Sequence, residues 1–173
     1  MELKVFTTFI TVMIIYRLIE MRLSKRNERI LSAQFPKIVN HSLKEKKFMM
    51  GIHVLWFISL MTEFIYSEQM TISGSWLFLC IFFIFIAFVL RGLSMKELGI
   101  YWTIPILEIE RGVNVRTGIY KYIKHPNYLA VVFEFIFIPL LFKCYITLTT
   151  FLMIKLIFLW KRIKLENKIL AQR

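Results

Sequence analysis

Two short polar stretches hold the residue types that could do chemistry in this sequence. The first is residues 118–128, GIYKYIKHPNY, in which His125 and Pro126 come directly before an apolar stretch. Proline suits the first turn of a helix, so we expect a helix to begin at Pro126. Its free backbone N–H groups and positive dipole end can hold a carboxylate or another polar group of a ligand. A belt of Tyr and Lys at a membrane interface explains the same pattern, and spacing alone does not exclude it.

The second stretch is residues 162–167, RIKLEN, in which Arg162 and Glu166 are four residues apart. On a helix this spacing places both side chains on one face. Taken alone, the pattern is explained more simply by a solvated ion pair at the end of a helix.

Other catalytic motifs are absent from the sequence. There is no Gly-rich phosphate loop and no HExxH, CxxC or GxSxG pattern. The three histidines, His41, His53 and His125, are too dispersed to predict a metal site, and we expect no metal. Cys80 and Cys144 are interpreted as small buried apolar residues. Any chemistry should therefore depend on the two polar stretches.

The composition predicts that membrane helices position these stretches. Of 173 residues, 58% are hydrophobic and 16% aromatic, and the mean hydropathy is +0.63. A water-soluble domain of this size cannot bury so much apolar surface, and a disordered chain does not carry it. The net charge of +12, combined with this hydrophobicity, indicates basic loops between membrane helices rather than binding to nucleic acid.

We predict a single all-α membrane domain over residues 1–173 with about five transmembrane helices. The expected spans cover residues 4–20, 48–67, 70–91, 128–142 and 145–161. Pro139 and the polar break at residues 143–145 indicate a turn, so the last two spans would form a helical hairpin. Each arm is short, and a hairpin that enters and leaves the membrane on one side is the alternative.

The distribution of basic residues orients these spans. Eight Lys or Arg lie in residues 21–47, six in residues 91–124 and five after Trp160, whereas the connection at residues 66–70 has none. The positive-inside rule then places the N-terminus outside and the C-terminus in the cytoplasm. Both polar stretches would therefore lie at the cytoplasmic face.

The two stretches together resemble a known family. GIYKYIKHPNY, then a hydrophobic hairpin, then R-x-x-x-E is similar to the isoprenylcysteine carboxyl methyltransferase (ICMT) family of integral-membrane methyltransferases. That family typically reads G-x-Y-x-x-x-R-H-P-x-Y and then R-x-x-x-E-E. The resemblance makes residues 98–170 the expected catalytic region. Residues 24–29, SKRNER, and 98–103, LGIYWT, resemble the small bacterial branch, which implies a bacterial cytoplasmic membrane.

The resemblance implies S-adenosylmethionine as the cofactor, bound at the cytoplasmic end of the last two helices. The residues carried over as cofactor-binding are Gly112, Val113, Asn114, Val115, Tyr120, His125, Pro126, Asn127, Tyr128 and Glu166. Arg162 would face the acceptor and forms, with His125, the expected catalytic pair. The sequence departs from the family pattern at two positions. Lys124 replaces an arginine and loses its planar guanidinium, and Asn167 replaces the second acid.

The implied function is O-methyl transfer to a lipid-like acceptor, either a prenylcysteine-type carboxylate or a long-chain acidic hydroxyl. A carboxylate is ionised near neutral pH and needs no base, so Arg162 would only orient it. A hydroxyl would need His125 as the base. The expected partners are this acceptor and membrane lipids. Phospholipid N-methylation and a non-catalytic membrane scaffold are the alternatives, and Arg162 argues against an amine acceptor.

Two charged residues lie deeper in the expected hairpin. Glu134 follows Tyr128 by six residues and Lys155 precedes Arg162 by seven, which gives depths of about 9 Å and 10.5 Å along the two helices. Because intramembrane charges are costly when unpaired, the matching depths predict that Glu134 and Lys155 face each other. The pair would either lock the hairpin or border a tunnel for the acceptor.

Overall fold

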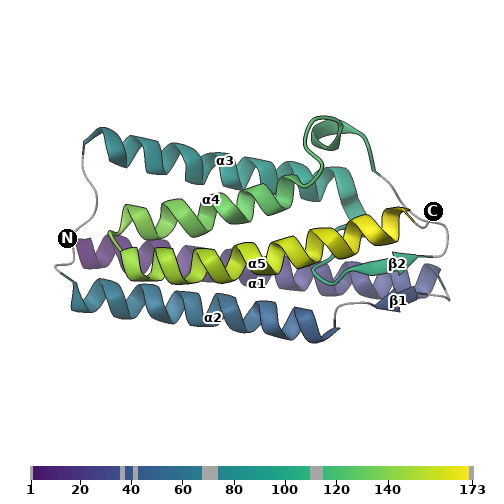
Figure 1. Cartoon of the computed structure of the whole chain (residues 1–173), viewed down its shortest axis with the longest axis horizontal. Helices are drawn as coiled ribbons and strands as arrows, with labels where there is room; N and C mark the ends of the chain where they lie inside the picture. Colours follow the sequence, from purple (N-terminus) through teal and green to yellow (C-terminus); the bar gives the residue numbers. More distant parts are fainter. Residues whose placement is uncertain (1, 36–37, 41–42, 68–73, 110–114, 172–173) are drawn as a thin grey trace.

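Five α-helices make up most of the chain. The structure is a computed structural model that describes residues 2–35, 38–40, 43–67, 74–109 and 115–171. The helices are α1 (Glu2–Gln34), α2 (Leu43–Tyr66), α3 (Ser75–Leu98), α4 (Pro126–Leu141) and α5 (Tyr145–Ala171). Successive helices run in opposite directions along one long axis (Figure 1). The predicted all-α class and the C-terminal helical hairpin are confirmed.

Several helix boundaries differ from the expected spans. α2 begins at Leu43 rather than residue 48, α3 ends at Leu98 rather than residue 91, and α5 continues to Ala171 rather than residue 161. α1 continues as one helix to Gln34, well past residue 20, because residues 21–34 contain neither Gly nor Pro and are rich in good helix formers. α3 begins at Ser75, after Gly74 with φ 69°, whereas the expected span began at residue 70. Residues 70–73 lie outside the described residues.

The short elements gather at one end of the bundle. Strands β1 (Ile38–Asn40) and β2 (Leu107–Ile109) pair antiparallel, and the 3-10 helices are η1 (Gly99–Tyr101) and η2 (Gly118–Lys121). Figure 1 places them beside the ends of α1, α3 and α5 and the start of α4, whereas the N-terminus and the α4–α5 turn lie at the opposite end. The described parts of the three basic segments therefore share one end, as the charge pattern predicted.

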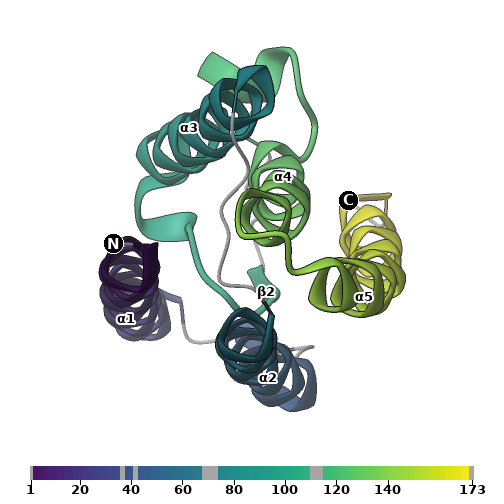
Figure 2. The ribbon, with the colours of Figure 1, turned by 90° about the vertical axis from the view of Figure 1, so that its left-hand side faces the viewer.

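Helix α4 occupies the centre of the bundle (Figure 2), where it packs between α3 and α5. It begins at Pro126 and contains Pro139 in its last turns, and Lys143 with φ 55° forms the turn into α5. The structure describes all of α4, and none of its large apolar side chains is exposed. The neighbouring helices therefore cover this short helix of 16 residues.

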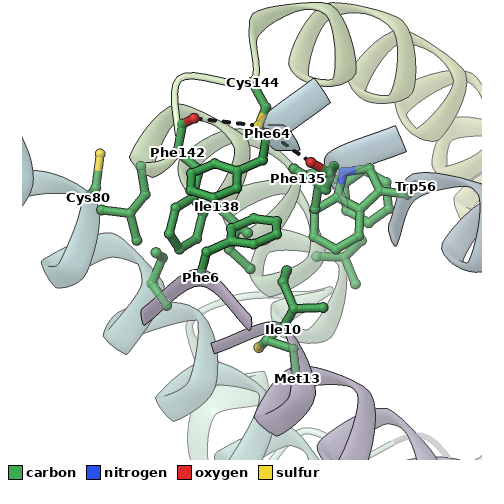
Figure 3. Close-up of a cluster of buried hydrophobic side chains, with 14 of the residues drawn as sticks. Phe6, Ile10, Met13, Trp56, Phe64, Cys80, Phe135, Ile138, Phe142 and Cys144 are labelled. Atoms are coloured by element: carbon green, nitrogen blue, oxygen red, sulfur yellow. Dashed lines mark hydrogen bonds between the residues drawn. The ribbon is translucent and has the colours of Figure 1, made fainter. Parts of the chain in front are cut away.

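Aromatic stacking holds the apolar core together across the helices (Figure 3). Phe6 of α1 stacks on Phe64 of α2 with ring centroids 3.9 Å apart. Trp56 of α2 stacks on Phe135 of α4 at 4.7 Å. Cys80 and Cys144 are buried as free thiols, as predicted. Aromatic pairs of this kind contribute about 0.5–1.5 kcal/mol each beyond the area they bury.

The outer faces of α1, α2, α3 and α5 carry many exposed large apolar side chains, of which Phe78 on α3 is 73% exposed. A soluble monomer rarely shows so much contiguous apolar surface. Two helical stretches, Lys47–Tyr66 and Ser75–Tyr101, are long and apolar enough to cross a membrane. This surface indicates a membrane protein, and the count of five spans stays a prediction.

A buried ionic cluster connects α1, α3 and α4. Glu134 is fully buried and accepts hydrogen bonds from Arg17 and from Arg91, the latter at 2.7 Å. Glu20 completes the cluster, with an oxygen 2.6 Å from Arg17 and another 3.0 Å from Arg91. Two guanidinium groups and two carboxylates therefore neutralise one another in the interior.

The predicted pair between Glu134 and Lys155 is wrong. Arginines from α1 and α3 reach the depth of Glu134 and hold it, and a guanidinium offers several N–H donors to a carboxylate. Lys155 Nζ has no hydrogen-bond partner among the described residues and lies 5.0 Å from the centroid of the Phe135 ring. Lys155 is thus buried by aromatic contact rather than by an ion pair.

This arrangement predicts that substitutions of Glu134 and of Lys155 affect the stability of the protein differently. Glu134→Gln should lower the free energy of unfolding by about 3–5 kcal/mol, because it leaves a surplus positive charge buried. Lys155→Met should not destabilise, because it removes an amine that has no hydrogen-bond partner among the described residues. Thermal and denaturant unfolding of the purified protein in detergent measures both. An equal loss in the two variants would contradict the observed pairing.

Candidate active site

A cavity of about 930 Å³ lies at the end of the bundle that holds the short elements. This volume is in the range of small-molecule sites in proteins, about 300–1,000 Å³. Its polar lining comes mainly from Tyr120, His125, Asn127, Tyr128, Arg162, Glu166 and Asn167. Its apolar lining comes mainly from Leu31, Leu98, Trp102, Pro105, Ile106, Leu107, Ile109 and Ile169. The cavity can therefore receive a ligand that has both polar and apolar parts.

A glycine sets the turn that leads into this site. Gly118 begins η2 with φ 51°, and a Cβ at this position would lie 2.2 Å from the carboxyl carbon of Glu97. Thr117 Oγ1 donates a hydrogen bond to Glu97 Oε2 at 2.9 Å. Glu97 of α3 therefore anchors the turn from which Tyr120 reaches the cavity, and the positive φ of Gly118 is the conformation that favours glycine at this turn.

Three side chains join the start of α4 to the end of α5. The His125 ring stacks on Tyr128 with centroids 5.3 Å apart, and its Nδ1 lies 3.4 Å from Glu166 Oε2. The Tyr128 hydroxyl donates a hydrogen bond to Glu166 Oε1. The predicted first turn at Pro126 and the last turns of α5 thus meet through one carboxylate.

Arg162 is held on several sides. Its Nε donates to the Tyr128 hydroxyl at 2.8 Å and lies 3.7 Å from Glu166 Oε1. Its Nη2 donates to the backbone carbonyl of Ile104, and its Nη1 makes only a weak contact with Met49 Sδ at 3.6 Å. Arg162 is 5% exposed, so its pairing with Glu166 is not that of a solvated helix end. Among the described residues, Nη1 therefore has the weakest acceptor, and its N–H groups are the ones most available to a ligand.

Several buried polar atoms at the cavity have no hydrogen-bond partner within the described part of the chain: His125 Nε2, Asn127 Oδ1 and Asn167 Oδ1. Buried polar atoms are nearly always paired in folded proteins, so these atoms indicate a polar ligand or ordered water. Burial raises the pKa of Tyr120, and nearby Glu166 adds to the effect. The Tyr120 hydroxyl therefore stays protonated near neutral pH and can donate a hydrogen bond.

The structure brings together most of the residues that the sequence singled out. Val115, Tyr120, His125, Asn127, Tyr128, Arg162 and Glu166 all line the cavity. Pro126 is buried in the first turn of α4 and is not part of the described lining. Gly112, Val113 and Asn114 lie outside the described residues. Glu134 and Lys155 do not belong to the described lining, and the roles of all these residues stay predictions.

Sequence reasoning missed two groups of lining residues. The segment Tyr101–Ile109, which includes the Ile104 carbonyl that holds Arg162, borders the cavity. Its signal in the sequence was only the change from an apolar helix to an aromatic and proline-containing stretch, WTIP. Three basic side chains, Arg116, Lys121 and Lys124, also line it. In the sequence all three count toward the topology, and Lys124 in addition replaces an arginine of the family pattern.

Comparison with known proteins agrees with this geometry. Residues 77–172 match the model of the isoprenylcysteine carboxyl methyltransferase (ICMT) family, and this stretch includes both polar motifs. The chain belongs to the ICMT family. It is also 30% identical to the uncharacterized protein YpbQ of Bacillus subtilis (strain 168) over 167 residues, 96% of this chain and 97% of that protein. No solved structure matches the chain.

Membership of the ICMT family makes the chain a membrane protein of methyltransferase type, in agreement with the exposed apolar faces of its helices. The family match begins in α3, so it contains α3, α4 and α5 and the loops that carry η1, β2 and η2. Helices α1 and α2 lie outside the matched segment. The cavity is nevertheless lined by Leu31 of α1 as well.

The turn at Gly118 predicts a difference between two glycines of this ICMT-family chain. Gly118→Ala should destabilise by about 1–2 kcal/mol from its positive φ, and the flexible end of Glu97 can move away from an added Cβ. Gly92→Ala is the matched control, because a Cβ there meets nothing within 4 Å and alanine favours the α3 helix. Thermal unfolding measures both, and equal unfolding midpoints would contradict the proposed role of Gly118.

Proposed function

We propose that the chain is an S-adenosylmethionine-dependent O-methyltransferase that acts on a lipid-like acceptor at the membrane interface. The observation that supports this most is the shared cavity of His125, Arg162 and Glu166, which also contains buried polar atoms that have no hydrogen-bond partner in the described part of the chain. Membership of the ICMT family supports methyl transfer as the reaction class. The apolar lining of the same cavity supports a lipid-like acceptor.

The polar lining suits the donor. The Glu166 carboxylate and the amide oxygens of Asn127 and Asn167 can accept hydrogen bonds from an amino group, an adenine amine or ribose hydroxyls. The Tyr120 hydroxyl can donate one. When bound, S-adenosylmethionine supplies a methyl group whose bond to the sulfonium sulfur breaks as the bond to the acceptor oxygen forms, leaving a neutral thioether. Its cationic sulfur is compatible with the negative charge of Glu166.

The charge of the cavity favours an anionic acceptor. Among the described lining residues, Arg116, Lys121, Lys124 and Arg162 are basic, and Glu166 is the one acid. Like charges brought together in a partly enclosed site repel strongly, so a protonated amine headgroup is disfavoured. A carboxylate or an acidic hydroxyl is attracted instead. This balance argues against phospholipid N-methylation.

Two side chains would act on the acceptor. Arg162 Nη1, whose acceptor in the structure is the weakly accepting Met49 Sδ, can orient an acceptor oxygen. If the acceptor is a hydroxyl, His125 Nε2 can take its proton, and Glu166 near Nδ1 stabilises the resulting imidazolium. A carboxylate needs no such step. Shelter from water favours the reaction in both cases, because opposite charges are neutralised as the methyl group moves.

We also propose that the five helices all span the bacterial cytoplasmic membrane, with the N-terminus outside and the cavity on the cytoplasmic side. Exposed aromatic residues support two interfaces: Tyr66 at the end of α2 and Trp76 at the start of α3 for one, Tyr122 before α4 and Trp160, two residues before Arg162, for the other. Tyr and Trp favour the level of the lipid headgroups. The basic segments at the cavity end support its cytoplasmic location.

The function is tested by incubating the purified protein with methyl-labelled S-adenosylmethionine and a bacterial membrane lipid extract. Label in an apolar product that alkali releases as methanol indicates a carboxyl ester, and an alkali-stable apolar product indicates a methyl ether. Either result supports the proposal. Label in a phospholipid amine headgroup would show N-methylation instead, and no label in any lipid would favour a scaffold.

The proposed role of Glu166 in holding the donor predicts that its substitution lowers the affinity for S-adenosylmethionine. Glu166→Gln should weaken S-adenosylmethionine binding by about 10–100-fold, because a hydrogen bond to a charged group contributes about 1.5–3 kcal/mol. Glu63→Gln is the matched control, since Glu63 accepts hydrogen bonds from Ile146 N and Thr147 N at the opposite end of α5. Calorimetric titration measures both affinities. Unchanged affinity in Glu166→Gln would remove this residue from the donor site.

A further inference from the structure

One peptide unit lies between α1 and the buried arginine of the site. The backbone N–H of Ile104 donates a hydrogen bond to Ser24 Oγ at 2.9 Å. The carbonyl of the same residue accepts a hydrogen bond from Arg162 Nη2. Ser24 is fully buried and donates its own proton to Glu28 Oε1 at 2.8 Å. Its hydroxyl is thereby oriented to accept from Ile104.

A second side chain of α1 holds the same segment. Asn27 is buried, and its Nδ2 donates to the carbonyl of Trp102 at 2.8 Å and to that of Gly99 at 3.1 Å. The backbone between η1 and β2 has no regular strand or helix to fix it. Side chains of α1 therefore hydrogen-bond to two backbone groups of this stretch and to the Gly99 carbonyl of η1.

The second half of α1 carries basic side chains on its exposed face and polar, uncharged side chains on its buried face. The positive-inside rule accounts for the basic residues but not for the buried polar ones. The exposed face carries Arg22, Lys25, Arg26 and Arg29. These four basic residues are enough to orient the helix by the positive-inside rule. Ser24 and Asn27, three residues apart, lie on the buried face instead. Burying two polar side chains is favourable only when they are hydrogen-bonded, so their contacts with residues 99–104 are specific.

We infer that Ser24 and Asn27 are positioning residues that set the orientation of Arg162 toward the acceptor through the Ile104 peptide. The inference rests on the proposed function, in which Arg162 orients the acceptor. A displacement of about 1 Å in an orienting group can cost about 100-fold in rate. The contacts of Glu166 with His125 and Tyr128 come from α4 and α5, so donor binding should be less affected. Helix α1, outside the segment matched to the family, thereby tunes the acceptor side.

Steady-state kinetics of Ser24→Ala with the acceptor found above test this role. We expect the acceptor KM to rise about tenfold or more, with the donor affinity unchanged. Ser24→Thr, which keeps the hydroxyl, should have an acceptor KM close to that of the wild-type protein. Ser32→Ala is the matched control, because Ser32 Oγ donates only within α1, to the Glu28 carbonyl at 2.8 Å. An unchanged acceptor KM in Ser24→Ala would overturn the inference.

A double-mutant cycle separates positioning from general destabilisation. If Ser24 acts through Arg162, Ser24→Ala should cost little further in an Arg162→Lys background, because interacting residues are not additive. Full additivity of the two losses would overturn the inference. Thermal unfolding of each variant is measured alongside, and a raised acceptor KM in a fully folded Ser24→Ala protein supports the positioning role.

Hydrogen–deuterium exchange tests the tether without turnover. The Ile104 amide should exchange faster in Ser24→Ala and at the normal rate in Ser32→Ala. Unchanged exchange in Ser24→Ala overturns the inference even when the wild-type protein is active. A wild-type protein that methylates no acceptor overturns the proposed function, whereas faster exchange in Ser24→Ala would still establish the contact between α1 and Ile104.

Discussion

An unpaired charge in apolar surroundings is costly, and this cost determines how the five helices assemble. Glu134 lies in the most buried helix and is held by arginines from α1 and α3. Because those arginines also share Glu20, neither can leave without exposing a charge to the interior. The cluster thus fixes α1 against α3 and α4, and the aromatic core completes the contact between α1 and α2. The packing of these helices in turn positions the elements that line the cavity.

The same principle acts differently at the cavity. There one acid, Glu166, meets Arg162, His125 and Tyr128, and further basic side chains line the opening without acidic partners in the described lining. The site therefore carries surplus positive charge before a ligand binds. A cationic donor alone would add to this surplus, whereas an anionic acceptor relieves it. Donor and acceptor are then favoured together, which suits a transfer between them.

Local patterns in the sequence were sufficient for the parts of the fold that depend on neighbouring residues. Pro126 marked the start of α4, the break at residues 143–145 marked the hairpin turn, and the spacing of Arg162 and Glu166 placed both on one face. The partner of Glu134 could not be predicted from the hairpin alone, because it depends on which other helices surround α4. The Ile104 carbonyl was also beyond prediction, since a backbone group has no signature in the sequence. Its location follows only from the irregular path of residues 99–106.

The enclosure of α4 has a consequence for how bilayer thickness acts on the protein. At 16 residues, α4 is about 24 Å long, shorter than a hydrocarbon layer of about 30 Å. Its large side chains are buried or partly buried, so in the proposed topology hydrophobic mismatch would act first on the four outer helices and reach α4 through them. The helix that begins directly after His125 would thereby be insulated from variation in acyl-chain length.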